Sequence, residues 1–106
     1  MPACSAVEGL WRSFACELGP RGVRFIVIRS AGSPDTPGVQ EVTAIHARRQ
    51  GLTPQQFDAR YAAETMLRRL PRVADVADAA TLLASDRASA MTAVHANVTC
   101  GAFFDL

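Results

Sequence analysis

The fold is decided by residues 5–28, which read SAVEGLWRSFACELGPRGVRFIVI. Residues 5–18 place apolar side chains at the three- and four-residue spacings of one helix face, namely Val7, Leu10, Trp11, Phe14, Ala15 and Leu18. Gly19-Pro20 then ends the helix, because glycine accepts a left-handed turn and proline cannot continue the hydrogen-bond ladder. Residues 23–28 are mostly apolar and β-branched, which is typical of a strand covered on both faces. A helix, a tight turn and a buried strand form the αβ half of a βαβ unit, so the stretch predicts an α/β fold.

The chain after this strand turns into a loop and then into a second helix. Residues 29–38 are rich in Gly, Ser, Pro and Asp, a composition typical of a loop. From Val39 the pattern is helical as far as Gly51, with Val39, Val42, Ile45 and His46 on one side.

Two further helices and a strand are predicted beyond Gly51. Thr53-Pro54-Gln55-Gln56 is a strong helix start, with Thr as N-cap, Pro in the first turn and Gln three residues after the Thr. We expect this helix to run through Phe57 and Tyr61 toward Leu70 and to break before Pro71. Residues 73–84 repeat the helical spacing, and residues 94–99 predict a last short strand.

Composition excludes several classes of protein. The 106 residues carry a net charge of +1, whereas a nucleic-acid surface needs a clustered basic excess, and all 11 basic residues are arginine. No apolar run approaches the roughly 18 to 20 residues that span a bilayer, and the N-terminus lacks the pattern of a signal peptide, so we expect a cytoplasmic protein that binds neither nucleic acid nor membrane. Cys4, Cys16 and Cys100 are odd in number and widely spaced, which favours small buried thiols over disulfides or a zinc site.

Several stretches, taken in order, resemble the short-chain dehydrogenase/reductase family. Ala6-Val7-Glu8-Gly9-Leu10, Arg12-Ser13 and residues 17–24 resemble the helix-to-strand segment of that family. Residues 75–77 and 83–92 resemble its last helix and the turn into its last strand. The resemblance covers nearly the whole chain. It implies the terminal part of a Rossmann-like doubly wound parallel sheet, two strands with flanking helices. Residues 1–106 would form a single partial domain, the C-terminal part of the family's domain.

The same resemblance implies an oxidoreductase that uses NAD or NADP to transfer hydride between a carbonyl and an alcohol. A Tyr acts there as acid/base and a nearby Lys lowers the pKa of the Tyr. The chain departs from that pattern, since it holds no G-x-x-x-G-x-G loop and no lysine. Aligned on residues 6–10, the Lys position is Cys4, the Tyr position would precede Met1, and the only tyrosine, Tyr61, lies in the wrong segment. A thiol cannot supply a fixed positive charge, so we assign no catalytic residue.

Cofactor contacts are carried over to two loop residues, Thr36 and Gly32. The family usually has Pro-Gly after the strand, followed within a few residues by a Thr that contacts the nicotinamide amide. Residues 30–36 read SAGSPDT, so Thr36 is the best match and Gly32 a weaker one. The family's strand Asn is Ile26 here, and residues 97–101, NVTCG, replace its Val-Asp-Gly-Gly.

Other chemistry-bearing residues each admit two interpretations. His46 is either an acid in a substrate pocket or a half-buried helix histidine, and the second is favoured. For His95 we favour a structural role. Cys4 could be a nucleophile, but no His or Asp lies close to it in the sequence to activate it. Arg48-Arg49 and Arg68-Arg69 are either an anion site or, as we favour, solvated helix faces. No metal ligands are assigned.

The sequence thus predicts a short-chain dehydrogenase/reductase-like polypeptide that is inactive and binds no dinucleotide by itself. The alternative is a non-catalytic interaction module that associates with itself or with a full-length relative, because the helix over residues 5–18 commonly packs against its copy in this family. A third interpretation is a fragment without a function of its own. The substrate and the choice between NAD and NADP are left open.

Overall fold

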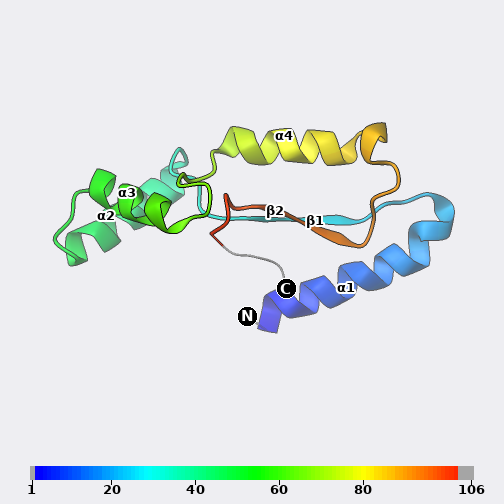
Figure 1. Ribbon diagram of the computed structural model, residues 1–106. Helices are drawn as coiled ribbons and strands as arrows, with labels where there is room; N and C mark the ends of the chain where they lie inside the picture. The colour runs from blue at the N-terminus through cyan, green and yellow to red at the C-terminus, as the bar shows by residue number, and fades with distance from the viewer. Residues whose placement is uncertain (1, 103–106) are drawn as a thin grey trace. The chain divides into compact units, whose positions relative to one another are not determined.

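The computed structural model describes residues 2–102. The helices and strands follow one another in the order α1 (Pro2–Leu18), β1 (Ile26–Ser30), α2 (Pro37–Arg49), α3 (Pro54–Glu64), α4 (Val73–Ala84) and β2 (Val94–Val98), with single 3-10 turns at Gly19–Arg21 and Asp86–Ala88 (Figure 1). The two strands are parallel neighbours, so the predicted α/β class is confirmed. The chain divides into two compact units, the first formed by residues 1–28 and 80–96 and the second by residues 29–79 and 97–106.

In the first unit the predicted order of helix, turn and strand is confirmed, but the helix begins at Pro2 rather than Ser5, and both ends of the strand differ from the prediction. The helix ends at Leu18, and Gly22 adopts a φ of 78° while its N–H donates to Gly19, so the Gly-Pro break is confirmed. The strand begins at Ile26 rather than Val23 and runs on to Ser30, so the predicted start was wrong. Its residues in the first unit are half-buried rather than fully covered.

The late start of β1 has a local cause in Arg24 and Phe25. The Arg24 guanidinium donates to the carbonyl oxygen of Leu83, in the last turn of α4, at 2.9 Å. It also donates to the carbonyl oxygen of Ser85, just after α4, at 3.2 Å. The N–H of Phe25 donates to the Thr92 hydroxyl at 3.0 Å instead of to a strand partner. Side-chain bonds thus replace part of the strand pairing before Ile26, although the Phe25 carbonyl oxygen still accepts from the Ala93 N–H at 2.8 Å.

The helices of the first unit cover the strands from two sides. Figure 1 shows α1 and the C-terminal part of α4 on opposite sides of the strand pair. Trp11 of α1 is buried, and its ring meets the edge of His95 on β2 at a centroid distance of 5.4 Å. The predicted apolar face of α1 is only partly buried. Val7 remains 62% exposed and Leu10 56% exposed.

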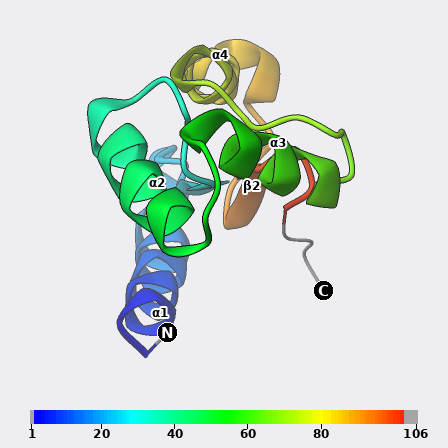
Figure 2. The ribbon, with the colours of Figure 1, turned by 90° about the vertical axis from the view of Figure 1, so that its left-hand side faces the viewer.

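The second unit is built on α2 and α3, which lie side by side in Figures 1 and 2. The predicted start of α3 is confirmed as a complete capping box, in which the Thr53 hydroxyl accepts from the Gln56 N–H and the Gln56 side chain accepts from the Thr53 N–H. The predicted end near Leu70 was wrong, because α3 stops at Glu64.

Thr65 accounts for this early end. Its backbone is extended, and its side chain is only 2% exposed. The Thr65 hydroxyl lies 2.9 Å from the Ala62 carbonyl oxygen and accepts the N–H of Arg69 at 3.1 Å. A buried β-branched residue that bonds the backbone on both sides replaces the next helical turn with a compact loop.

The helix over Val73–Ala84 has the predicted bounds, and carboxylates cap its start. Asp75 accepts from the Arg72 N–H at 2.8 Å, and Asp35 accepts from the Val73 N–H at 3.2 Å. Both contacts lie within the second unit.

Of the three cysteines only Cys100 is buried, while Cys4 and Cys16 are exposed, so the prediction of buried thiols was wrong for those two. Both lie on α1, which is covered along only part of its surface and also leaves Leu10 exposed. Over residues 2–102, none of the helices combines the length and the apolarity that crossing a membrane requires.

Candidate functional site

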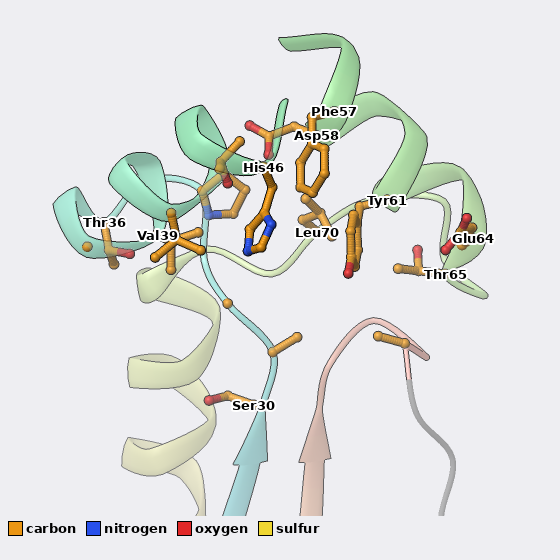
Figure 3. A pocket seen from close by; sticks show the side chains of 17 residues that line it. Ser30, Thr36, Val39, His46, Phe57, Asp58, Tyr61, Glu64, Thr65 and Leu70 are labelled. Atoms are coloured by element: carbon orange, nitrogen blue, oxygen red, sulfur yellow. The ribbon is translucent and has the colours of Figure 1, made fainter. Parts of the chain in front are cut away.

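A cavity of about 830 Å³ lies in the second unit, beyond the carboxyl end of β1 (Figure 3). Its walls come from the end of β1, the loop that follows, α2, α3 and the residue Ala102 that follows β2. The volume falls in the range of about 300–1,000 Å³ that is usual for small-molecule sites. Ligands of open parallel sheets bind at this end of the strands, so the position as well as the size is that of a binding site.

The loop between β1 and α2 is held in place by its own hydrogen bonds. The Thr36 hydroxyl donates to the Ser33 carbonyl oxygen at 2.8 Å, and the Thr36 N–H donates to the same oxygen at 3.1 Å. Gly32 packs so closely on α2 that an added Cβ would lie 3.3 Å from the nearest methyl carbon of Val39. The loop therefore presents mostly backbone and small side chains to the cavity.

Three aromatic rings from α2 and α3 form one wall of the cavity, which we call the aromatic wall (His46, Phe57 and Tyr61). The rings of His46 and Phe57 are nearly parallel, at 11° and a centroid distance of 6.1 Å. The Tyr61 ring lies 5.2 Å from that of Phe57. Figure 3 shows the three side chains next to one another along the cavity. They give the cavity a wall of neighbouring rings, in which the Tyr61 ring is tilted by 40° from that of Phe57.

The charged side chains that line the cavity are carboxylates. Asp58 and Glu64 of α3 contribute to the lining, and none of the chain's arginines does. Apolar side chains fill much of the remainder, namely Val39, Val42 and Leu70. The lining of the cavity is thus mostly apolar and includes two carboxylates.

Some of the candidate residues predicted from the sequence lie together at this cavity. Thr36 and Gly32 both line the cavity, as do Val39, Val42 and His46 from the predicted face of α2. Ile45 does not line it and is 49% exposed. His46, for which a half-buried helix position was favoured, is exposed and faces the cavity, because α3 packs beside α2 and encloses the space in front of its ring.

The other candidates lie elsewhere. Cys4 is exposed on α1 in the first unit. His95 lies on β2, where its Nε2 is 3.2 Å from an Oε1 of Glu8, a partner that sequence spacing did not reveal. Arg48 and Arg49 are exposed in the last turn of α2, and Arg69 pairs with Asp75 at 3.0 Å. The favoured interpretation of solvated helix faces fits Arg48 and Arg49. It was wrong for Arg68 and Arg69, because α3 ends at Glu64 and both lie in the loop that follows.

The sequence analysis missed Phe57 and Tyr61 as site residues. Their four-residue spacing places both rings on one face of α3, and that spacing was the available signal. The spacing could not show what this face meets, because the contact with α2 is tertiary.

The residues present fit the nicotinamide end of a dinucleotide. Gly32 offers a surface without a side chain, and the Thr36 hydroxyl, whose proton goes to Ser33, keeps lone pairs that can accept from a carboxamide. No glycine-rich pyrophosphate loop occurs in this sequence. Within residues 2–102 no cluster of three or more His, Cys, Asp or Glu side chains is arranged to hold a metal ion.

Comparison with known proteins identifies the family. The family model described as enoyl-(acyl carrier protein) reductase matches residues 1–102. Among solved structures, sorbitol-6-phosphate 2-dehydrogenase from Erwinia amylovora is 26% identical, with a TM-score of 0.82, over 92% of this chain and 38% of its own. A C-terminal deletion mutant of Thermoplasma acidophilum aldohexose dehydrogenase is also 26% identical, with a TM-score of 0.81, over 92% of this chain and 42% of its own.

A short-chain dehydrogenase family protein from Francisella tularensis shares the fold at 19% identity and a TM-score of 0.83. Comparison of the sequence with curated proteins gives no significant match. The chain spans about two fifths of the length of the first two solved relatives. The fold is therefore the Rossmann-like fold of these relatives, and the chain belongs to the short-chain dehydrogenase/reductase family.

Proposed function

We propose that this chain forms the substrate side of the active site of an NAD- or NADP-dependent oxidoreductase and is the C-terminal part of that enzyme's domain. The observation that carries the proposal is the cavity beyond β1, which is enclosed by the loop with Gly32 and Thr36 and by α2 and α3. A bound reduced nicotinamide would supply hydride to a carbonyl carbon, and a proton would complete the alcohol.

In this proposal the chain's own residues bind and enclose rather than catalyse. Gly32 and Thr36 hold the carboxamide of the nicotinamide, and α2 and α3 keep water from the substrate. The acid/base Tyr and the pyrophosphate loop come from residues outside this sequence, whereas the position of the Lys is held by Cys4. The cytoplasmic location and the oligomeric assembly expected from the sequence belong to the proposal as well.

A chimaera tests the proposal. The upstream part of the Erwinia sorbitol-6-phosphate 2-dehydrogenase, through the residue that aligns with Cys4, is joined to residues 5–106 of this chain. We expect the chimaera to bind NAD(H) or NADP(H) in titration calorimetry, and the 106-residue chain to give no measurable binding of either. A chimaera that unfolds cooperatively yet binds neither dinucleotide would overturn the proposal.

One substitution within the chimaera separates binding from chemistry. With Cys at the position of Cys4, dinucleotide affinity should change little, whereas hydride transfer should fall by about 100-fold or more, because a phenol without a neighbouring ammonium keeps its pKa near 10. Unchanged hydride transfer in this variant would show that the alignment at Cys4 is wrong.

A second function is favoured by the exposed face of α1. Val7, Leu10 and Phe14 are 62%, 56% and 40% exposed, although they belong to the apolar stripe of an amphipathic helix. A non-catalytic module that associates with itself or with a full-length relative would bury this face. Co-purification of the tagged chain with a full-length relative, lost on Leu10→Gln substitution, would support this alternative.

A further inference from the structure

We propose that the cavity takes an uncharged carbonyl compound with a planar aromatic body, or the matching alcohol, and excludes sugar phosphates. The inference rests on the proposed function and narrows its substrate class. It follows from the aromatic wall, from the charges of the lining residues and from the contacts that the nearby arginines make.

The aromatic wall provides the surface on which such a substrate stacks. The ring centroids lie 5.2 Å and 6.1 Å apart, so the three rings are direct neighbours, with the Tyr61 ring tilted by 40° from that of Phe57. Tyr61 is 53% exposed, so the face of the wall is open to a ligand rather than buried by protein. Aromatic rings favour stacked or edge-on planar partners at this range of distances.

The lining excludes an anionic substrate. Recognition of a phosphate requires a cation or a set of backbone N–H groups, and arginine is the residue best suited to it. The chain has 11 basic residues, all arginine, yet the cavity is lined by none of them and by the carboxylates Asp58 and Glu64. A dianionic phosphate in this cavity would therefore be repelled.

Arginines close to the lining residues in the sequence make other contacts. Arg60, next to Tyr61, donates to the Gln50 side-chain oxygen at 3.4 Å. Arg68 donates to the Ala63 carbonyl oxygen, and Arg69 pairs with Asp75 at 3.0 Å. Both line a smaller cavity together with Arg72, and this second cavity shares Pro34, Asp58 and Leu70 with the first. The aromatic wall and its carboxylates thus set this chain apart chemically from a relative that acts on sorbitol 6-phosphate.

The test measures binding to the full 106-residue chain, with 2-acetylnaphthalene and sorbitol 6-phosphate as the probes. We expect saturation-transfer NMR and equilibrium dialysis to show saturable binding of the ketone, near one molecule per chain, with a Kd of about 1 mM or tighter. We expect no saturable binding of the sugar phosphate. Binding of the sugar phosphate as tight as that of the ketone, or absence of ketone binding, would overturn the proposal.

Matched variants locate the ketone. Tyr61→Ala should weaken its binding about tenfold, since a stacked exposed ring is removed without touching the core. Phe14→Ala removes an exposed ring from α1 and should leave the affinity unchanged. Tyr61→Arg should abolish ketone binding and create binding of sorbitol 6-phosphate. Equal loss in Tyr61→Ala and Phe14→Ala would place the ketone on exposed apolar surface in general and overturn the assignment.

The chimaera described above separates this inference from the proposed function. If the chimaera binds a dinucleotide but reduces only sugar-type carbonyls, the substrate class is wrong and the oxidoreductase assignment stands. If the chain binds the ketone at the aromatic wall and the chimaera binds no dinucleotide, the oxidoreductase assignment fails while the cavity's preference stands.

Discussion

Gly101 occupies a position that a residue with a side chain would disrupt. Its φ is +81°, and an added Cβ would lie 2.5 Å from the Cβ of Met66 and 3.1 Å from its backbone nitrogen. Gly101→Ala should therefore destabilise the fold by at least about 1–2 kcal/mol, from the left-handed backbone alone, with the clash in addition. The change in the urea midpoint measures this loss.

A second glycine provides the matched control. Gly9 lies inside α1, and an added Cβ there meets nothing within 4 Å. Gly9→Ala should stabilise the helix by about 0.5–1 kcal/mol, because alanine loses less conformational freedom. Equal effects of the two substitutions would contradict the close approach of Met66 to Gly101.

Asp75 makes stability depend on pH in the acid range. Its pKa lies below the usual 3.8, because the carboxylate accepts from the Arg72 N–H and from the Arg69 guanidinium. A group whose pKa is lowered by folding stabilises the fold above its unfolded pKa, and this contribution is lost as the pH falls through the lower folded value. The same contact raises the pKa of Arg69, but Arg69 stays protonated throughout the acid range and adds no pH dependence there.

Asp75→Asn should consequently lower the free energy of unfolding at neutral pH. The difference from wild type should disappear well below pH 3.8. Thermal melts followed by circular dichroism from about pH 2 to 7 measure the effect. Asp78→Asn, one turn further along α4 and exposed, is the control and should not reproduce it. A constant difference at all pH values would argue against the carboxylate as the cause.

At the scale of the element, α3 depends on the capping box at its start. The Thr53 hydroxyl satisfies the Gln56 N–H, which has no partner within the helix. Thr53→Ala should destabilise the second unit by about 0.5–2 kcal/mol. Thr53→Ser keeps the acceptor and should restore most of the loss. An alanine variant as stable as the serine variant in thermal melts would show that the cap contributes nothing.

Element boundaries could be predicted from the sequence where a local signal sets them. Gly19-Pro20, Thr53 with Gln56, and the start of α4 at Val73 were found in this way. Boundaries set by tertiary contacts could not be predicted. Arg24 donates to the carbonyl oxygen of Leu83, far along the chain, and Thr65 is buried against the loop that follows it. No pattern in the neighbouring residues reports such partners.

The candidate site divides in the same way. Thr36 and Gly32 were found by resemblance to a family loop, which is local in sequence. The aromatic wall was missed, since His46 and Phe57 meet only because α2 packs beside α3. Helical spacing predicts which side chains share a face but not which second face they meet.

For the whole molecule, the amount of exposed apolar surface predicts self-association. Large apolar side chains that are at least half exposed include Val7, Leu10, Val42, Met66, Leu67 and Leu82. Among residues 2–102, β1 and β2 pair only with each other, so each has an outer edge that can accept another strand. Burying each large apolar side chain contributes about 1.5–3 kcal/mol, so docking of a second copy is favourable.

Size-exclusion chromatography with light scattering at micromolar concentration tests this expectation. The chain should elute above its monomer mass of 11.3 kDa. Leu10→Gln should shift the distribution toward the monomer, whereas Glu17→Gln on the same helix should not. A single monomer peak with a cooperative thermal transition would contradict self-association.

The carboxylate of Asp35 joins the loop beside the cavity to the first turn of α4. It accepts the N–H of Val73 at 3.2 Å. Asp35 comes one residue before Thr36, the N-cap of α2. The rate at which the Val73 amide exchanges with deuterium therefore reports how often the loop opens. A ligand that holds the loop closed and is present at ten times its Kd should slow this exchange about tenfold. The Ala15 amide of α1 should keep its rate, and in Asp35→Ala the ligand should no longer slow exchange at Val73.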